Sequence, residues 1–272
     1  MRIAQTGASG LVGRFIAQAA LAAGHDLVLL SRRPLPLPGE YRRFDLLADP
    51  PPLGDVDAVI HAAFQHVPGR YRGGEGADPA GFLHANRDGT LRLFEAAAGR
   101  RILFLSSRAV FDGYPPGTQL AEDLPPRPTS LYAEAKLLAE AAVADHGGAS
   151  LRATGVYGPG PDHKWLSLFA DFCAGRTVAP HAASEVHGAD LAAAAMLLLN
   201  GGAGVFHVSD LLLDRHDLLA EVARLTGCRH PLPARATAPV SLLDCRRLRD
   251  LGWRPGGWDR LCADLPAMLG QT

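Results

Sequence analysis

The residues best suited to chemistry are a tyrosine and a lysine four positions apart, Tyr132 and Lys136. This spacing places both side chains on one face of a helix. The phenol of tyrosine has an ordinary pKa of ~10, so a neighbouring ammonium is needed to stabilise the phenolate near neutral pH. A tyrosine and a lysine on the exposed face of a helix, with no chemical role, have the same spacing. The acid–base interpretation therefore needs support from other parts of the sequence.

A strand-like run ending in two serines supplies one such signal. Ile102–Leu105 leads into Ser106 and Ser107, and hydroxyl groups at a strand end face the crevice of an open α/β sheet. We predict that Ser107 binds the substrate oxygen while Tyr132 passes the proton. The adjacent Arg108 suits a substrate carboxylate or phosphate, and equally a structural ion pair with the Glu122-Asp123 loop.

A glycine-rich loop predicts the cofactor. The strand Arg2–Gln5 runs into Gly7, Gly10 and Gly13 and then into a long apolar helix, which is the context that a dinucleotide fingerprint requires. Glycines allow a tight turn and close approach of the pyrophosphate, which the helix N-terminus attracts. Within this loop we also predict cofactor contacts from Ser9, Leu11 and Val12.

The end of the second strand distinguishes NADP(H) from NAD(H). An NAD-binding fold usually has an acidic residue there for the ribose hydroxyls, whereas this strand ends in Ser31, Arg32 and Arg33. Guanidinium groups pair with a 2′-phosphate, so we predict that NADP(H) is preferred and NAD(H) possible. Two solvated loop arginines are the alternative. Asp45 suits the adenine amino group or solvent, and the small Ala62 and Ala63 leave room for the cofactor.

These residues must be positioned by alternating strands and helices, which indicate an α/β fold, a Rossmann doubly wound parallel sheet. The expected strands are Arg2–Gln5, Asp26–Leu30, Tyr41–Phe44, Ala58–His61, Ile102–Leu105 and Leu151–Thr154. The expected helices are Leu11–Ala23, Phe82–Ala98 and Tyr132–His146. We expect Gln65–Pro79, with Arg70 and Arg72, to be a lid or a crossover.

The alternation becomes less regular beyond residue 158, where Gly/Pro breaks begin. We predict a Rossmann domain over residues 1–158 and a smaller C-terminal substrate-binding lobe over residues 159–272, interleaved with the last sheet strands. Trp165, near the junction, is the tryptophan expected to touch substrate. Later elements are expected at Asp190–Leu199, Val205–Val208 and His216–Thr226.

Composition excludes several other functions. The 272 residues carry a net charge of −1, which gives no general attraction for nucleic acid or a membrane. The four cysteines are scattered and the histidines lack metal-ligand spacing, so we expect no metal. With no signal-peptide pattern, we expect a cytoplasmic protein that acts on a small molecule.

The whole pattern resembles the extended short-chain dehydrogenase/reductase family, also called the sugar-nucleotide epimerase/dehydratase family. The resemblance covers nearly all of the chain. The matching segments are Gly7-x-x-Gly10-x-x-Gly13, Asp45-Leu46, His61-x-Ala63, Asn86 with Gly89-Thr90, Ser106-Ser107, Tyr132-x-x-x-Lys136, Leu151-Arg152, Val156-Tyr157-Gly158-Pro159, Val186-His187-Gly188-Ala189-Asp190-Leu191 and Leu251-Gly252-Trp253-x-Pro255.

The resemblance implies roles for individual residues. Ser107, Tyr132 and Lys136 would be catalytic, and Asn86 would order the site. The stretch Thr154–Val156 would border the nicotinamide, Leu46 would lie beside the cofactor with Asp45, and Tyr132 and Lys136 would also contact it. Family members form homodimers through the helices expected at Phe82–Ala98 and Tyr132–His146, so a homodimer is possible.

Departures from the family pattern narrow the reaction. Sugar-nucleotide dehydratases have a carboxylate pair where this chain has Arg108 and Ala109, so a dehydration has no acid and base here. We expect an NADP(H)-dependent oxidoreductase acting on a carbonyl or alcohol, possibly sugar-derived. The alternatives are a nucleotide-sugar epimerase that retains its cofactor and, outside enzymes, an NADP(H)-sensing regulator.

Overall fold

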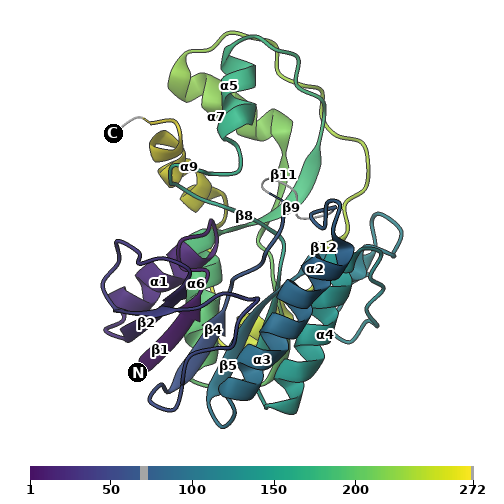
Figure 1. Cartoon of the computed structure of the whole chain (residues 1–272). Helices are drawn as coiled ribbons and strands as arrows, with labels where there is room; N and C mark the ends of the chain where they lie inside the picture. Colours follow the sequence, from purple (N-terminus) through teal and green to yellow (C-terminus); the bar gives the residue numbers. More distant parts are fainter. Residues whose placement is uncertain (68–72, 271–272) are drawn as a thin grey trace.

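The computed structural model describes residues 1–67 and 73–270; the expected lid segment falls partly outside these residues, and Arg70 and Arg72 lie outside them. A seven-stranded, wholly parallel sheet forms the centre (Figure 1). Its spatial order is β3-β2-β1-β4-β5-β7-β10, so the order reverses between β1 and β4. The strands are β1 Arg2–Thr6, β2 Asp26–Ser31, β3 Glu40–Arg43, β4 Ala58–His61, β5 Arg101–Ser107, β7 Ala149–Ala153 and β10 Gly204–Val208.

Helices cover both faces of this sheet. Helices α1 (Gly13–Ala22) and α6 (Gly188–Leu199) pack on one face, and α3 (Gly89–Ala96) and α4 (Leu131–Asp145) on the other (Figure 1). Successive strand residues point to opposite faces. The inner strands are largely apolar on both faces because both faces are buried, whereas the edge strand β3 is mostly exposed. The structure confirms the predicted Rossmann fold.

The predicted single helix Phe82–Ala98 is wrong in detail. The chain forms α2 (Pro79–Leu83), a π-helical turn η1 (His84–Asp88) and then α3. The buried side chain of Asn86 donates a hydrogen bond to the carbonyl of Phe82 over 3.1 Å and reaches the backbone of Gln65. A π turn admits one extra residue into the helix, and here that turn contains Asn86.

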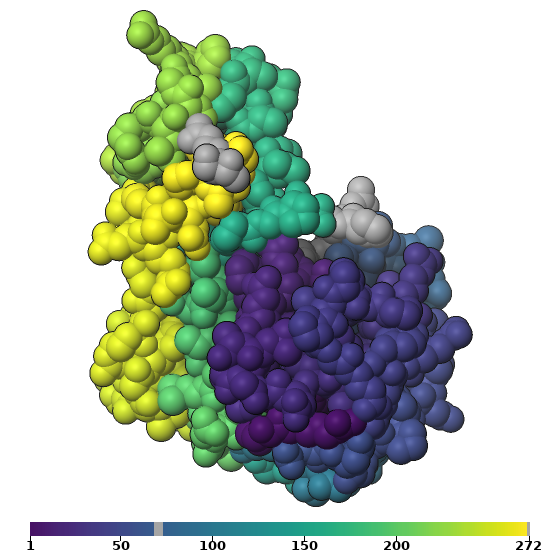
Figure 2. All heavy atoms as spheres, turned by 90° about the vertical axis from the view of Figure 1, so that its left-hand side faces the viewer, coloured from purple at the N-terminus to yellow at the C-terminus, as the bar shows by residue number. Residues whose placement is uncertain are grey.

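A smaller lobe stands above the sheet (Figures 1 and 2). Strand β8 (Gly155–Tyr157) runs parallel to β9 (Ala182–His187), which pairs antiparallel with β11 (Leu211–Asp214). The lobe has its own buried core, to which residues of three helices contribute. These helices are α5 Leu166–Cys173, α7 Arg215–Thr226 and α9 Gly257–Met268.

The chain crosses between the two parts more than once. After β9 it returns to the central sheet as α6 and β10, and the C-terminal segment then runs beside both parts (Figure 2). The short strands β6 (Gln119–Leu120) and β12 (Leu242–Leu243) pair with each other, and α8 (Arg246–Asp250) follows. The division into 1–158 and 159–272 remains a proposal. Among the described helices none has the length and apolar character needed to cross a bilayer.

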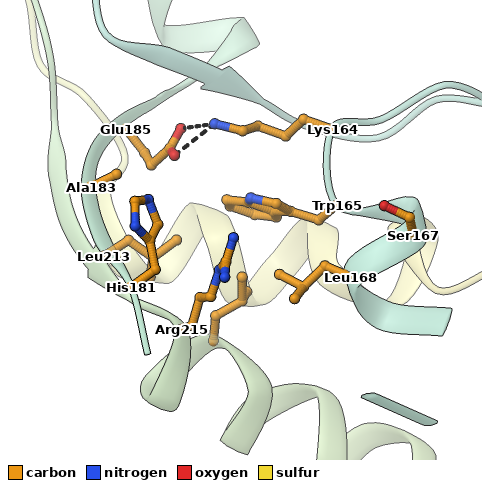
Figure 3. Close-up of a pocket in the computed structure, with 10 residues that line it drawn as sticks. Lys164, Trp165, Ser167, Leu168, His181, Ala183, Glu185, Leu213 and Arg215 are labelled. Carbon is orange, nitrogen blue, oxygen red and sulfur yellow. Dashed lines mark hydrogen bonds and ion pairs between the residues drawn. The ribbon is translucent and has the colours of Figure 1, made fainter. Parts of the chain in front are cut away.

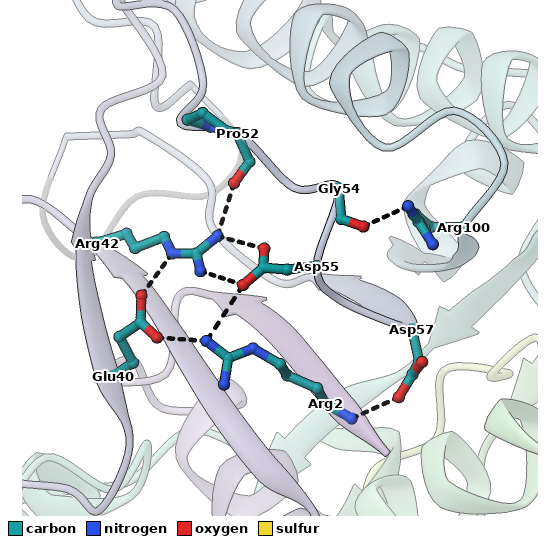
Figure 4. A network of polar contacts seen from close by, with 8 residues as sticks. All are labelled: Arg2, Glu40, Arg42, Pro52, Gly54, Asp55, Asp57 and Arg100. Carbon is teal, nitrogen blue, oxygen red and sulfur yellow. Dashed lines mark hydrogen bonds and ion pairs between the residues drawn. The ribbon is translucent and has the colours of Figure 1, made fainter.

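An ion-pair network lies at the amino ends of the strands (Figure 4). Arg42 pairs with Asp55 over 2.5 Å and with Glu40 over 2.8 Å, and Arg2 reaches both carboxylates. The carboxylates are about half exposed, at 46% and 50%, so water and salt screen these pairs strongly. The network fastens the edge strand β3 at the end of the sheet opposite the site described next.

Candidate active site

The glycine loop is packed tightly against the carboxyl ends of β1 and β4. Gly7 has a φ of +70°, and a Cβ there would lie 2.7 Å from the backbone of Ala62 and Ala63. A Cβ on Gly13 would lie 2.1 Å from the carbonyl oxygen of Gly7. Both positions therefore exclude any larger residue, as the predicted fingerprint requires.

The strand ends around this loop are held together by Thr6 and His61. The Thr6 hydroxyl accepts hydrogen bonds from the N–H groups of Ala62 and Ala63, each over 3.1 Å, and lies 2.7 Å from Nδ1 of His61. On the other side, Nε2 of His61 lies 2.9 Å from the hydroxyl of Thr90. Complete burial, with the charge of Lys136, lowers the pKa of His61 to about 3. His61 is therefore a neutral structural link between β1, β4 and α3.

The loop leaves a surface suited to an anion. Ser9 and Gly10 are exposed, and Val12 stands at the N-cap of α1 without a side-chain cap. N–H groups at such a helix start bind phosphate. Arg14, in the first turn of α1, donates a hydrogen bond over 2.6 Å to the carbonyl of Pro159 and so ties this region to the smaller lobe. The residues present thus fit the pyrophosphate of a dinucleotide.

The predicted ribose-phosphate residues follow β2. The hydroxyl of Ser31 donates a hydrogen bond over 2.6 Å to the carbonyl of Arg33, and Arg32 and Arg33 are exposed. Asp45, half-buried after β3, accepts a hydrogen bond from the N–H of Leu47 over 3.0 Å. Leu46 differs, because its side chain is buried in the core between the sheet and α3.

Helix α4 is capped by Ser130, whose hydroxyl accepts a hydrogen bond from the N–H of Ala133 over 3.3 Å. This cap fixes Tyr132 in the first turn. One turn later, the ammonium of Lys136 is buried, with 4% of the residue exposed, and donates a hydrogen bond to the carbonyl of Leu105 over 2.6 Å. The helix is thereby joined to β5 just before the serine pair.

Aromatic rings surround Lys136. Its Nζ lies 4.6 Å from the ring centre of Phe64, 4.7 Å from that of Phe104 and 5.9 Å from that of Tyr132. Phe64 also packs edge-on against Tyr132, with ring centres 5.0 Å apart. Burial lowers the pKa of Lys136 to about 7, against the opposing influence of Glu140. The structure thus brings Tyr132 and Lys136 together around Phe64, which follows β4.

Ser107 ends β5 and caps the following 3-10 turn, η2 (Arg108–Phe111), by accepting a hydrogen bond from the N–H of Ala109 over 3.2 Å. A hydroxyl that accepts here keeps its proton for another acceptor. Arg108 pairs with Asp112 over 3.0 Å. Glu122, in the loop that the sequence suggested as a partner, accepts a hydrogen bond from the N–H of His207 and faces Arg247.

Three further predicted residues border the same edge of the sheet. Asn86 is buried, and its amide both donates to and accepts from the backbone of Gln65, each over 2.7 Å. It therefore orders the loop that carries Ala62, Ala63 and Phe64. Thr154, after β7, is buried and donates a hydrogen bond over 3.2 Å to Ser209, and Val156 is buried in β8.

A buried ion pair beneath α4 was missed from the sequence. Glu140 accepts hydrogen bonds from Ser106 and from the guanidinium of Arg152, the shortest to Arg152 being 2.6 Å. Both ion-pair side chains are 4% exposed. The sequence contained one signal for Glu140 alone, because it lies one helical turn after Lys136 and therefore on the same face of the helix.

The smaller lobe contains a pocket of about 230 Å³ between α5, α7, β9 and β11 (Figure 3). Lys164 forms an ion pair with Glu185 on one wall, at 2.5 Å, and Arg215 and His181 enter from the other side. Trp165, predicted to touch substrate, lines this pocket and stacks on Tyr157 at 4.9 Å. None of the pocket's lining residues belongs to the predicted catalytic set.

Across residues 1–67 and 73–270, no three metal-binding side chains gather in one place. The described residues near the glycine loop include a phenol, a buried amine and hydroxyl groups. These lie at the carboxyl ends of parallel strands, where the strand order reverses and open α/β sheets bind ligands.

Comparison with known proteins identifies similar chains. The model of the NAD dependent epimerase/dehydratase family matches residues 3–204. A dTDP-4-dehydrorhamnose reductase of Mycolicibacterium smegmatis is 27% identical, covering 100% of this chain and 87% of the relative. A UDP-glucose 4-epimerase of Streptomyces lividans is 28% identical, covering 93% and 91%. The structure of the Thermus thermophilus UDP-glucose 4-epimerase in complex with NAD matches with a TM-score of 0.78 and 25% identity, over 100% of both chains.

Proposed function

This chain belongs to the NAD-dependent epimerase/dehydratase family, and we propose that it is an NADP(H)-dependent oxidoreductase with Tyr132 as its acid and base. The reaction moves a hydride between nicotinamide and the carbon of a carbonyl or alcohol. The observation that carries the proposal is the meeting of Tyr132 and Lys136 around Phe64, beside the end of β5. The glycine loop, Gly7–Gly13, lies on the same edge of the sheet and supplies the binding site for the dinucleotide.

The residues have complementary parts in the proposed reaction. When bound, the nicotinamide supplies or receives the hydride. In reduction, Tyr132 gives its phenolic proton to the substrate oxygen and Ser107 donates a hydrogen bond to that oxygen. The ammonium of Lys136 stabilises the phenolate that remains. In oxidation the same phenolate takes the proton of the alcohol, so the proton and the hydride balance in both directions.

The preference for NADP(H) is supported by the charges after β2. Arg32 and Arg33 are exposed there, and Ser31 holds the turn by its hydrogen bond to Arg33. Two guanidinium groups at this place favour a 2′-phosphate over a free hydroxyl. Asp45 is available to the adenine, and Ala62 and Ala63 leave space for the cofactor beside the strand ends.

We further propose that the substrate is a nucleotide sugar. The similar proteins carry the names of dTDP- and UDP-sugar enzymes. In this chain, the lobe pocket presents the cationic Arg215 with His181, and the ring of Trp165. A guanidinium and an aromatic ring suit a phosphate and a planar base, respectively. Arg108, which follows Ser107 in the chain, is the residue that we propose contacts the sugar end.

The test is a coupled assay with purified protein, NADPH or NADH, and the probes dTDP-4-dehydrorhamnose, UDP-glucose and simple ketones. We expect consumption of NADPH that is stoichiometric with alcohol formed from a ketone probe. Conversion of UDP-glucose to its 4-epimer without net NADPH consumption would instead support the epimerase, the second candidate, which the Streptomyces lividans relative favours. Binding of NADPH without turnover of any probe would contradict the enzyme proposal and support a regulator.

A further inference from the structure

The carboxylate of Glu140 is fully engaged although it is buried. It accepts a hydrogen bond from the hydroxyl of Ser106, and it accepts from Nε and Nη2 of Arg152 over 2.9 Å and 2.6 Å. A buried carboxylate is stable as an ion only with such partners. Glu140 is therefore a fixed negative charge inside the protein.

The partners of Glu140 come from the strands that carry the site. Ser106 on β5 pairs in register with Arg152 on β7, so both side chains lie on the face that α4 covers. Their successors along each strand, Ser107 and Ala153, also pair in register and face the other side. Glu140 thus joins α4 to both strands immediately before they reach the reaction site.

The same carboxylate lies one helical turn from Lys136. The groups that face the ammonium are Glu140 and Tyr132 on α4, His61 on β4 and the carbonyl of Leu105 on β5. His61 stays neutral over the working pH range because its pKa is about 3. Glu140 is then the anion that opposes the burial of Lys136, and Arg152 balances its charge.

We propose that Glu140 and Arg152 are positioning residues of the reaction, which act through Lys136 by setting the charge that faces Tyr132. The inference rests on the proposed function in taking Tyr132 and Lys136 as the catalytic pair. Neither Glu140 nor Arg152 touches the reacting atoms. Their effect is electrostatic, since removing one partner leaves the other as an unbalanced buried charge.

The composition of the chain allows a direct test, because the sequence contains two lysines, Lys136 and Lys164. Protein labelled with ¹³C at lysine Cε gives two NMR signals, which Lys164→Arg assigns. Each signal is followed against pH in the free, full-length protein. No substrate or cofactor is needed, so the titration is independent of enzyme activity.

The two charge-removing variants are expected to move the Lys136 midpoint in opposite directions. Glu140→Gln leaves the Arg152 cation unbalanced and lowers the midpoint by about one to two pH units, the effect of a unit charge at ~6 Å with an effective dielectric of ~20. Arg152→Met leaves the Glu140 anion unbalanced and raises the midpoint. Glu140→Asp keeps the charge and restores a midpoint close to that of the unmodified protein. Glu185→Gln is the matched control, which shifts Lys164 and leaves Lys136 unchanged.

A merely structural role gives a different result. Loosening of α4 would admit water, and both variants would then move Lys136 upward toward its ordinary value of 10.5. An upward shift of the Lys136 midpoint in both variants overturns the proposal. If only one of the two variants folds, an unchanged Lys136 midpoint in that variant also overturns it. Opposite shifts in a protein that turns over no probe would support the electrostatic control of Lys136 by Glu140 and Arg152, and would refute the proposed function.

Discussion

Replacing Lys136, the lysine of the proposed catalytic set, is expected to destroy activity and stabilise the fold at neutral pH. The variant is Lys136→Met, which preserves the length of the side chain and removes the charge. Below about pH 7 the lysine is protonated in both the folded and the unfolded state. Folding then buries a charge, and the whole free-energy cost of burying that charge lowers the stability of the protein. Between pH 7 and 10.5 the folded protein holds the neutral amine while the unfolded chain remains protonated. Stability therefore rises with pH through this window.

The magnitude follows from the two pKa values. The pKa of Lys136 is about 7 in the folded protein and 10.5 ordinarily, and each pH unit is worth ~1.4 kcal/mol. Linkage then gives a burial penalty of about 4 kcal/mol at pH 7 and about 2 kcal/mol at pH 9. The variant leaves the carbonyl of Leu105 without its donor, which costs about 1–3 kcal/mol. We expect Lys136→Met to be more stable than the unmodified protein by about 1–3 kcal/mol at pH 7.

The assay is urea unfolding of both proteins at pH 7 and pH 9, followed by circular dichroism. Comparing the two proteins at each pH removes the contributions of other titrating groups. The advantage of Lys136→Met is expected to shrink by roughly 2 kcal/mol between pH 7 and pH 9. The reasoning is refuted if the stability advantage of Lys136→Met is the same at pH 7 and pH 9, or if it is larger at pH 9.

Three further substitutions test the cofactor and substrate contacts. Gly13→Ala places a Cβ 2.1 Å from the carbonyl oxygen of Gly7, so α1 must move. We expect the Kd for NADPH, measured by fluorescence titration, to rise at least about tenfold. We expect the free energy of unfolding, measured in urea, to fall by about 1–3 kcal/mol. Arg32→Ala is expected to raise the KM for NADPH about tenfold with little change for NADH, and equal effects on both would defeat the NADP(H) assignment. Arg108→Ala is expected to raise the substrate KM about tenfold with a smaller effect on kcat, and an unchanged KM would remove the anion-binding role.

Local patterns predicted the glycine loop and the helix that carries Tyr132 and Lys136, because both patterns are short spacings. The three glycines and the Tyr132/Lys136 pair carry their meaning within a few residues, and the structure places both at the carboxyl ends of the strands. The strand boundaries also agree closely, since a strand buried on both faces is a continuous apolar run. Asp26–Leu30, for example, ends one residue before the observed β2, Asp26–Ser31.

The missed features depend on contacts between residues far apart in the chain. Glu140 and Arg152 meet only because β7 lies beside β5 under α4, and no local spacing predicts that pair. For Arg108 the sequence suggested a substrate anion or the Glu122-Asp123 loop, and it did not indicate the ion pair with Asp112 that the structure shows. The π turn at Asn86 follows from its hydrogen bonds to Gln65, which lies 21 residues earlier. In the smaller lobe, short strands such as β8 were missed because three residues carry too little periodicity.

The most direct test of the central claim is the turnover of Tyr132→Phe with the ketone probe that the unmodified protein reduces. The substitution removes one hydroxyl and keeps the ring that packs against Phe64. We predict a fall in kcat of about 10²–10⁴-fold, the usual contribution of a positioned acid, with the Kd for NADPH unchanged within about twofold. Turnover close to that of the unmodified protein, with the cofactor bound normally, would contradict the assignment of Tyr132 as the acid and base.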